Sequence, residues 1–302
     1  MFAQHVTHFT LAHKRCLIPL VVSTNSARNT VLSKTMFFER TRLWRVLFVP
    51  ALLLVALFAI LSGKLAHAND NCTSTSFDET VTIKTIIDGD TILLEDARFV
   101  RLIGINTPEL NKKSPPAEPY AQAAKDTLST ILQDVKQIGL IHGKDKHDHY
   151  QRLLAHAFLL NGTNIQSELL KKGMAQHILI PPNNAMYECY RQAEQQSQSK
   201  KAGLWSHAYF RVMDADELTL RHIGFFRVVG TIKEIKKRKD NYWLVINERF
   251  SFRIDGDSLK HFKRNRPETL RTHTIQASGW IFPYKAGLNM RIQHPLNMKI
   301  LD

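Results

Sequence analysis

The sequence is poor in features that would assign it quickly to a class. It has only three cysteines among 302 residues, which excludes a disulfide-dense scaffold. Its longest apolar run, residues 46–61, is shorter than the roughly 20 residues with which a helix crosses a bilayer. The central histidines lack the spacing of a zinc site, so we interpret them as surface or packing residues. They are His142, His147, His149, His156 and His177.

Positive charge is abundant but unevenly distributed. The formal charge of +14 is typical of proteins that bind nucleic acid. Residues 1–68 contain eight Lys and Arg against one acid, and residues 69–206 contain 15 against 16. Residues 207–302 contain 18 against 10. The basic surface of a mature protein would therefore belong to the last third of the chain.

The N-terminal segment, residues 1–68, has the pattern of an export signal. Basic residues ending at Arg45 precede the apolar run 46–61, and Ala66 and Ala68 form a small-x-small cleavage pattern. We therefore expect a periplasmic or secreted protein whose mature chain starts near Asn69. The alternative is an uncleaved membrane anchor formed by residues 46–61.

The start of translation is open at this point. Residues 1–35 have no clear periodicity, and Met36 begins a leader of ordinary shape. We expect no regular structure upstream of Met36.

The cysteines predict one disulfide. Cys16 would be lost with the leader, which leaves Cys72 and Cys189 as an even pair in an exported protein. The alternative is two unpaired small side chains.

Three short polar stretches suggest chemistry on a phosphodiester. They are Asp88-Gly89-Asp90-Thr91, the segment from Arg101 to Glu109, and Asp148-His149-Tyr150-Gln151-Arg152. A phosphodiester gains negative charge as water attacks it. Its hydrolysis therefore needs a cation, a base for the water, and guanidinium groups that hold the phosphate oxygens.

These stretches resemble the staphylococcal nuclease family over roughly residues 80–206. The order and spacing match the family's motifs, and Pro182-Asn183-Asn184 and Gly203-Leu204-Trp205-Ser206 match its last third. The resemblance implies that Arg101 and Arg152 are the catalytic arginines and that Glu109 is the general base. It also implies cleavage at the 5′-oxygen of DNA or RNA, leaving 3′-phosphates.

The resemblance further implies a metal site with one departure from the family. Asp90, the Asn106 side chain and the Thr107 carbonyl would hold Ca²⁺ or another hard divalent cation, where the family has Asp in place of Asn106. Asp88 would act as a nearby acid, and Tyr150 would contact a terminal phosphate. Read alone, the Asp88 and Asp90 pair favours a simple turn over a metal site, and the downstream Asn106-Thr107-Pro108-Glu109 reverses that preference.

The family's nucleotide-pocket tyrosines are a second departure. This chain has Ile178-Leu179-Ile180-Pro181 at their place, just before Pro182-Asn183-Asn184. The change bears on base preference and leaves the catalytic trio untouched.

Hydrophobic patterning predicts an α+β, mostly β architecture in two domains. In residues 69–206, five short strands with interspersed helices suit a five-stranded OB-fold barrel, which the resemblance also implies. Residues 219–302 read as a smaller, basic, β-rich domain that suits a second OB-like barrel. Its aromatics beside basic residues either form a stacking groove for single strands or fill a core. They are Tyr242, Trp243, Phe250 and Phe252.

Three functional classes remain on the sequence alone. The first is an exported, metal-dependent endonuclease acting on DNA or RNA, with no stable membrane partner if the leader is cleaved. The second is a catalytically silent module that binds nucleic acid or protein. The third, an envelope structural protein, leaves Arg101, Glu109 and Arg152 unexplained.

Overall fold

The computed structural model describes residues 72–110 and 117–302. The expected leader and its cleavage site, Cys16 and the alternative start at Met36 lie outside the described residues. Within those residues, no helix has the length and apolar character needed to cross a membrane.

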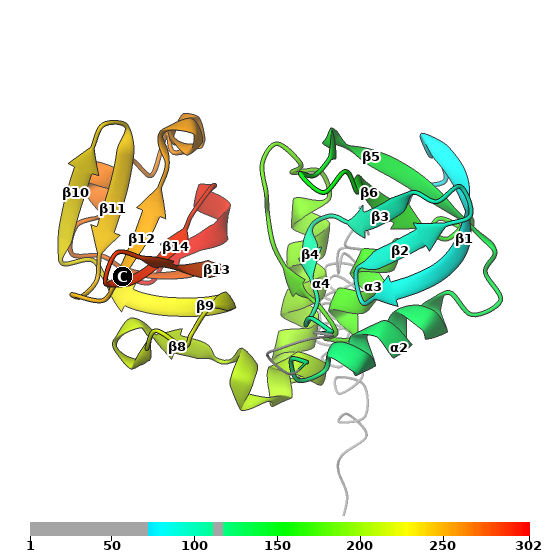
Figure 1. The fold of residues 1–302 in the computed structure, drawn as a ribbon, viewed down its shortest axis with the longest axis horizontal. Helices are drawn as coiled ribbons and strands as arrows, with labels where there is room; N and C mark the ends of the chain where they lie inside the picture. Colours follow the sequence, from blue (N-terminus) through cyan, green and yellow to red (C-terminus); the bar gives the residue numbers. More distant parts are fainter. Residues whose placement is uncertain (1–71, 111–116) are drawn as a thin grey trace, which may run out of the picture. The chain divides into compact units, whose positions relative to one another are not determined.

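A closed five-stranded barrel forms the first half of the described chain (Figure 1). The order around it is β1-β2-β3-β6-β5. The strands are β1 (Glu79–Asp88), β2 (Thr91–Leu94), β3 (Phe99–Leu102), β5 (Gln137–His147) and β6 (Leu153–Phe158). Strands β3 and β6 are parallel and their other barrel neighbours are antiparallel. The predicted OB-type barrel is therefore confirmed.

Period-two alternation in β3 explains how the barrel presents a charged side chain. Val100 and Leu102 are completely buried in the barrel core, whereas Phe99 and Arg101 point to the opposite face. Because successive side chains alternate across a strand, the same four residues seal the core and orient Arg101 outside it.

Helices and short strands complete this half. The helices are α2 (Ala121–Ile131), α3 (Ile165–Lys171) and α4 (Tyr187–Ser199), followed by the 3₁₀ turns η1 (Gly203–Ser206) and η2 (Ala208–Phe210). Asn164 caps α3, since its side chain accepts a hydrogen bond from the Ser167 N–H at 2.7 Å. Two-residue strands β4 (Ile105–Asn106) and β7 (Gln176–His177) pair with each other.

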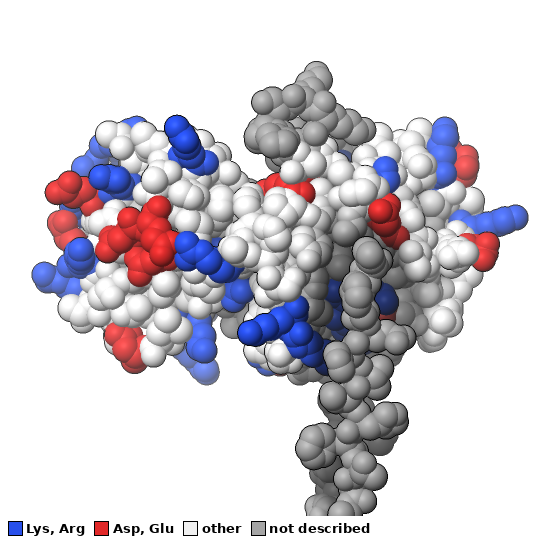
Figure 2. All heavy atoms as spheres, turned by 90° about the horizontal axis from the view of Figure 1, so that it is seen from below, with Lys and Arg blue, Asp and Glu red and all other residues white. Residues whose placement is uncertain are grey.

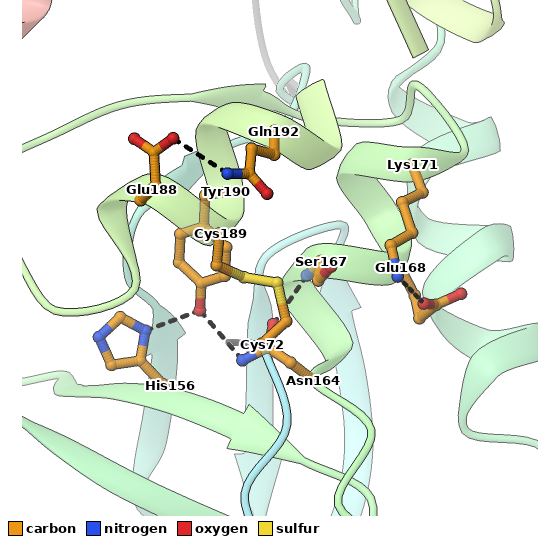
Figure 3. Close-up of a disulfide and its surroundings, with 10 residues drawn as sticks. All are labelled: Cys72, His156, Asn164, Ser167, Glu168, Lys171, Glu188, Cys189, Tyr190 and Gln192. Carbon is orange, nitrogen blue, oxygen red and sulfur yellow. Dashed lines mark hydrogen bonds and ion pairs between the residues drawn. A yellow bond between two sulfur atoms is a disulfide. The ribbon is translucent and has the colours of Figure 1, made fainter. Parts of the chain in front are cut away.

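Figure 3 shows how the residues just before β1 are joined to α4. Cys72 and Cys189 are joined by a disulfide, with their Cα atoms 5.4 Å apart. Beside it, the buried Tyr190 hydroxyl lies 2.7 Å from the His156 Nδ1 and accepts a hydrogen bond from the Asn164 side-chain amide. Helix α4 is thus held by one covalent bond and one buried polar cluster.

The second half of the described chain is a β-rich sheet. Its strands are β8 (Val212–Asp214), β9 (Gly224–Thr231), β10 (Glu234–Arg238), β11 (Asn241–Val245), β12 (Phe250–Ile254), β13 (Thr274–Tyr284), β14 (Gly287–Arg291) and β15 (Met298–Ile300). The 3₁₀ turns are η3 (Ala215–Glu217), η4 (Gly256–His261), η5 (Pro267–Leu270) and η6 (Pro295–Asn297). The order is β10-β11-β12-β14-β13-β9-β8, with β15 beside β13. Since β8 pairs with β9, residues 212–214 also belong to this sheet.

This sheet repeats the strand connectivity of the barrel. The Ile232 N–H donates to the His273 carbonyl, and the adjacent Lys233 N–H donates to the Val245 carbonyl. The chain therefore passes without a break from pairing with β13 to pairing with β11. Strands β9 and β10 together, then antiparallel β11 and β12 and the parallel β12–β14 pair, follow the order of β1, β2, β3 and β6 in the first barrel.

The core of the second sheet decides between the two interpretations of its aromatics. Tyr242, Phe250 and Phe252 are 3%, 1% and 0% exposed and belong to its hydrophobic core. For these three the stacking-groove interpretation was wrong. Trp243, the next residue after Tyr242, points to the opposite face and is only half-buried.

Candidate functional site

The turn between β1 and β2 places the first acidic pair. The Asp90 N–H donates to the Asp88 Oδ1 at 3.1 Å, which fixes the turn that the sequence predicted. Gly89 is required because a Cβ there would lie 2.9 Å from both Ala124 and Thr107. The turn therefore packs directly against α2 and against the loop that carries Thr107.

Asp90 connects three segments of the site. Its Oδ2 lies 2.8 Å from the Arg101 guanidinium and accepts a hydrogen bond from the Thr107 N–H at 3.1 Å. Its Oδ1 accepts a hydrogen bond from the Thr91 hydroxyl. Burial raises the pKa of Asp90; the Arg101 charge opposes the rise and the Asp88 carboxylate adds to it.

Asn106 ends β4, Thr107 follows it, and both residues are buried. Within the described residues, the Asn106 side chain makes no hydrogen bond, so its carbonyl oxygen is available as a ligand. Asp90, Asn106 and the Thr107 carbonyl supply the oxygen donors that hard cations prefer. This donor set fits such a cation. The described residues contain no cluster of three or more His, Cys, Asp or Glu side chains that could hold a metal ion.

Glu109 is held from the far side of the loop by another acid. Its backbone N–H donates to the Glu118 Oε2 at 2.9 Å, and its carbonyl accepts from the Glu118 N–H. The Tyr209 hydroxyl donates to the other Glu118 oxygen at 3.0 Å. Glu109 reaches solvent, yet partial desolvation and the Asp90 and Asp88 carboxylates raise its pKa to about 7.

Arg152 is held by a turn built around Asp148. The Asp148 Oδ1 accepts hydrogen bonds from the Tyr150 and Arg152 N–H groups, each at 2.9 Å. Its Oδ2 accepts from the Arg152 Nε at 2.7 Å. The Arg152 guanidinium also lies 5.5 Å from the centre of the Tyr150 ring. Asp148 thus leaves the NH1 and NH2 groups of Arg152 for another partner.

One cavity collects these side chains. It measures about 610 Å³ and is lined by Arg101, Glu109, Tyr150 and Arg152. The proposed metal ligands Asp90, Asn106 and Thr107 do not line this cavity, but Asp90 contacts the lining residue Arg101. The motifs therefore meet although Arg101 and Arg152 are distant in sequence.

The part of the chain that contains Arg101, Glu109 and Arg152 is similar to known proteins. The model of the "Staphylococcal nuclease homologue" family matches residues 99–207. The thermonuclease of Staphylococcus intermedius is 34% identical over 131 residues, which cover 42% of this chain and 76% of that protein. The thermonuclease of Staphylococcus hyicus is 33% identical over 138 residues, covering 44% and 80%. The chain belongs to the staphylococcal nuclease family.

For other relatives, the matched segment covers a smaller share of the relative's length. Endonuclease YncB of Bacillus subtilis is 33% identical over 131 residues, which cover 42% of this chain and 61% of that protein. Within this staphylococcal nuclease homologue, the family match includes Arg101, Glu109 and Arg152 and ends before β8. The second sheet therefore lies outside the matched region.

Sequence reasoning missed several residues of this nuclease-family site. Asp148 was noticed only as part of a motif, although its spacing to Arg152 is that of a turn in which a carboxylate accepts later N–H groups. Glu118 and Tyr209 carry no local signal, because they meet across 91 residues of sequence. Trp280 of β13 also lines the cavity, beside the Ile178 and Ile180 that replace the family's tyrosines.

Proposed function

We propose that this protein is an exported, metal-dependent nuclease that hydrolyses phosphodiester bonds of DNA or RNA. The observation that carries the proposal is the convergence of Arg101, Glu109 and Arg152 on one cavity beside the buried Asp90. The names of the relatives, thermonuclease and endonuclease, support the same reaction class.

The residues divide the chemistry among them. Arg101 and Arg152 hold the phosphate oxygens and stabilise the charge that develops on them. Glu109 orients a water molecule and takes its proton as the water oxygen adds to phosphorus. The bond to the 5′-oxygen breaks, and that oxygen takes a proton from solvent. A hard cation such as Ca²⁺, held by Asp90, Asn106 and the Thr107 carbonyl, supplies further positive charge.

A catalytically silent module is the second candidate. Such a module needs the fold and a binding surface, but it does not need a carboxylate and two arginines lining one cavity. The retention of all three groups favours the enzyme. The export half of the proposal rests on the sequence pattern of residues 1–68.

A zymogram decides between the enzyme and the silent module. The chain from Asn69 is run on gels containing DNA or RNA and developed with Ca²⁺ or with a chelator. We expect clearing with Ca²⁺, loss of clearing with the chelator, and no clearing by the Glu109→Gln variant. Binding of either polymer without cleavage under all conditions would establish the silent module instead.

A further inference from the structure

The outer face of the second sheet carries a transverse row of aromatic and cationic side chains. Strand pairing sets Lys236 of β10 opposite Trp243 of β11, Trp243 opposite Arg253 of β12, and Arg253 opposite Arg291 of β14. Facing residues in neighbouring strands point to the same side of a sheet. The row is therefore continuous across four strands on the face opposite the hydrophobic core.

A groove of about 330 Å³ lies along this face. Two aromatic side chains line it, Trp243 and Tyr284. Four cationic side chains also line it, with one carboxylate, that of Glu248. The cations are Lys236, Arg238, Arg249 and Lys285. Such a groove combines flat apolar surfaces with an excess of positive charge.

The Trp243 ring is fixed in place. Its indole N–H donates to the Asn289 Oδ1 at 3.2 Å, and its centre lies 6.0 Å from that of Tyr284 with the two rings tilted by 31°. Arg253 packs over Trp243 at 5.4 Å and is held there by an ion pair with Asp255. Trp243 lines the groove and Arg253 does not. Part of the indole surface is therefore accessible from the groove and is not covered by the Arg253 guanidinium.

The acidic side chains near the groove do not neutralise its cations, which can therefore bind an anion. Lys236 pairs with Glu234 at 3.0 Å, and both side chains are about half exposed, so this pair contributes little. Asp255 is shared between Arg253 and Arg291. On the face drawn in Figure 2, basic (blue) and acidic (red) side chains both occur, so net charge alone does not identify a binding surface. The groove is distinguished by its four cationic side chains against one carboxylate.

We propose that this groove binds single-stranded nucleic acid. Bases stack on Trp243 and Tyr284, and the surrounding lysines and arginines contact the phosphates. A base within a duplex already has both faces stacked, so the accessible parts of these half-buried rings favour an unpaired strand. This inference deepens the proposed nuclease function, on which it rests for the identity of the polymer, and it assigns the second sheet to holding substrate.

Binding is tested in a chain that does not cut. The Glu109→Gln protein is titrated into a fluorescent oligothymidylate of about 12 nucleotides, and anisotropy gives the dissociation constant at several salt concentrations. We expect Trp243→Leu and Tyr284→Leu each to weaken binding by about 5- to 100-fold, the loss associated with one stacked base. Trp243→Phe keeps a ring and should retain much of the affinity.

Two neighbouring lysines provide the matched control for charge. Lys236 and Lys237 are consecutive on β10 and point to opposite faces, with Lys237 packed against Tyr242. Lys236→Gln should lower the slope of log affinity against log salt by about 0.7, the value for one phosphate contact on a single strand. Lys237→Gln should leave the slope unchanged.

Several outcomes would overturn this assignment. They are equal affinities for the parent protein and Trp243→Leu, equal slope changes for Lys236→Gln and Lys237→Gln, and equal affinity for a duplex of the same length. Binding of poly-glutamate but not of the oligonucleotide would assign the groove to an acidic protein. A uridine oligonucleotide distinguishes RNA from DNA. None of these results depends on cleavage, so failure of the nuclease proposal would show separately in the zymogram.

Discussion

The Arg101 guanidinium lies 2.8 Å from the Asp90 Oδ2, with the two side chains only 13% and 4% exposed. The cavity-lining arginine of β3 is therefore also the counter-charge of a buried carboxylate. Arg152 differs, because its partner Asp148 and its own guanidinium are nearer the surface. The two arginines line the same cavity but differ in how deeply their ion pairs are buried.

This difference predicts that Arg101→Ala and Arg152→Ala lower turnover by similar factors, whereas Arg101→Ala lowers the free energy of unfolding more. Each should lower turnover by about 10²–10³-fold through loss of one charge-stabilising donor. Arg101→Ala should also lower the free energy of unfolding by about 3 kcal/mol, because it leaves Asp90 buried without its partner. Urea unfolding and initial rates on one substrate measure both effects.

Arg191→Ala is the control for the arginine variants. Arg191 pairs with Glu188 on the exposed side of α4, where the loss should be below about 1 kcal/mol with no change in rate. Equal stabilities for the Arg101 and Arg152 variants would mean that Asp90 does not need Arg101 as its counter-charge.

Asn106→Asp should increase the affinity for calcium. The amide offers one oxygen without charge, and a carboxylate adds a negative charge to a site that otherwise has Asp90 alone, which strengthens the binding of a hard cation. Without metal the buried second carboxylate should lower the thermal midpoint. With Ca²⁺ the midpoint should rise further than in the parent protein, because tighter binding to the folded state adds more stability.

Calcium titrations by thermal unfolding and by activity test the Asn106 prediction independently. Asn161→Asp makes the same chemical change in an exposed loop and should behave as the parent protein does. If Asn106→Asp needs as much calcium as the parent or more, Asn106 is not a ligand.

Local patterning was sufficient to predict the barrel. Alternation over residues 98–103, with Phe99, Arg101 and Ile103 on one face, predicts the strand observed as β3, and Asp88-Gly89 predicts the turn that leads into β2. The structure adds the contact between the Thr107 N–H and Asp90, which explains why that turn and the loop before Glu109 act as one unit. The periodicity of residues 164–172 predicts a helix, and α3 is observed at Ile165–Lys171.

Long-range relationships were not accessible from the sequence. Tyr242 and Trp243 are adjacent aromatics, and alternation requires that they point to opposite faces. It does not say which face is the core, because that depends on β9 and β13 arriving from elsewhere in the chain. The clamp of Glu118 on Glu109 likewise depends on Tyr209, which only the folded chain brings near.

The disulfide between Cys72 and Cys189 should contribute about 2–5 kcal/mol to stability. It joins cysteines 117 residues apart in sequence and connects the residues just before β1 to α4. We expect Cys72→Ser and Cys189→Ser, singly and together, to lower the urea midpoint by similar amounts, since either change removes the same bond. Reduction of the parent protein should reproduce the loss. If peptide mapping finds two free thiols in protein recovered from an oxidising compartment, the disulfide does not form and this prediction is wrong.

Glu194 of α4 predicts a specific pH dependence of stability. Its carboxylate accepts a hydrogen bond from the backbone N–H of His177 at 2.8 Å. Desolvation raises the pKa of Glu194 to about 7, and this hydrogen bond and the Arg227 charge partly oppose the rise. The folded protein therefore holds a proton on Glu194 in a range where the unfolded chain has released it. Stability should fall as pH rises from about 5 to about 7 and then level off.

The comparison with Glu194→Gln isolates this effect from other buried groups. His156 and His177 have pKa values lowered to about 4 by burial, so their contribution rises with pH over the same range and opposes that of Glu194. The glutamine keeps an oxygen for the His177 N–H but does not titrate. The difference in unfolding free energy between parent and variant should therefore change with pH up to about 7, by at most about 1.4 kcal/mol for each pKa unit of displacement. Urea midpoints at pH values across this range supply the measurement, and a constant difference would show that Glu194 titrates normally in the folded protein.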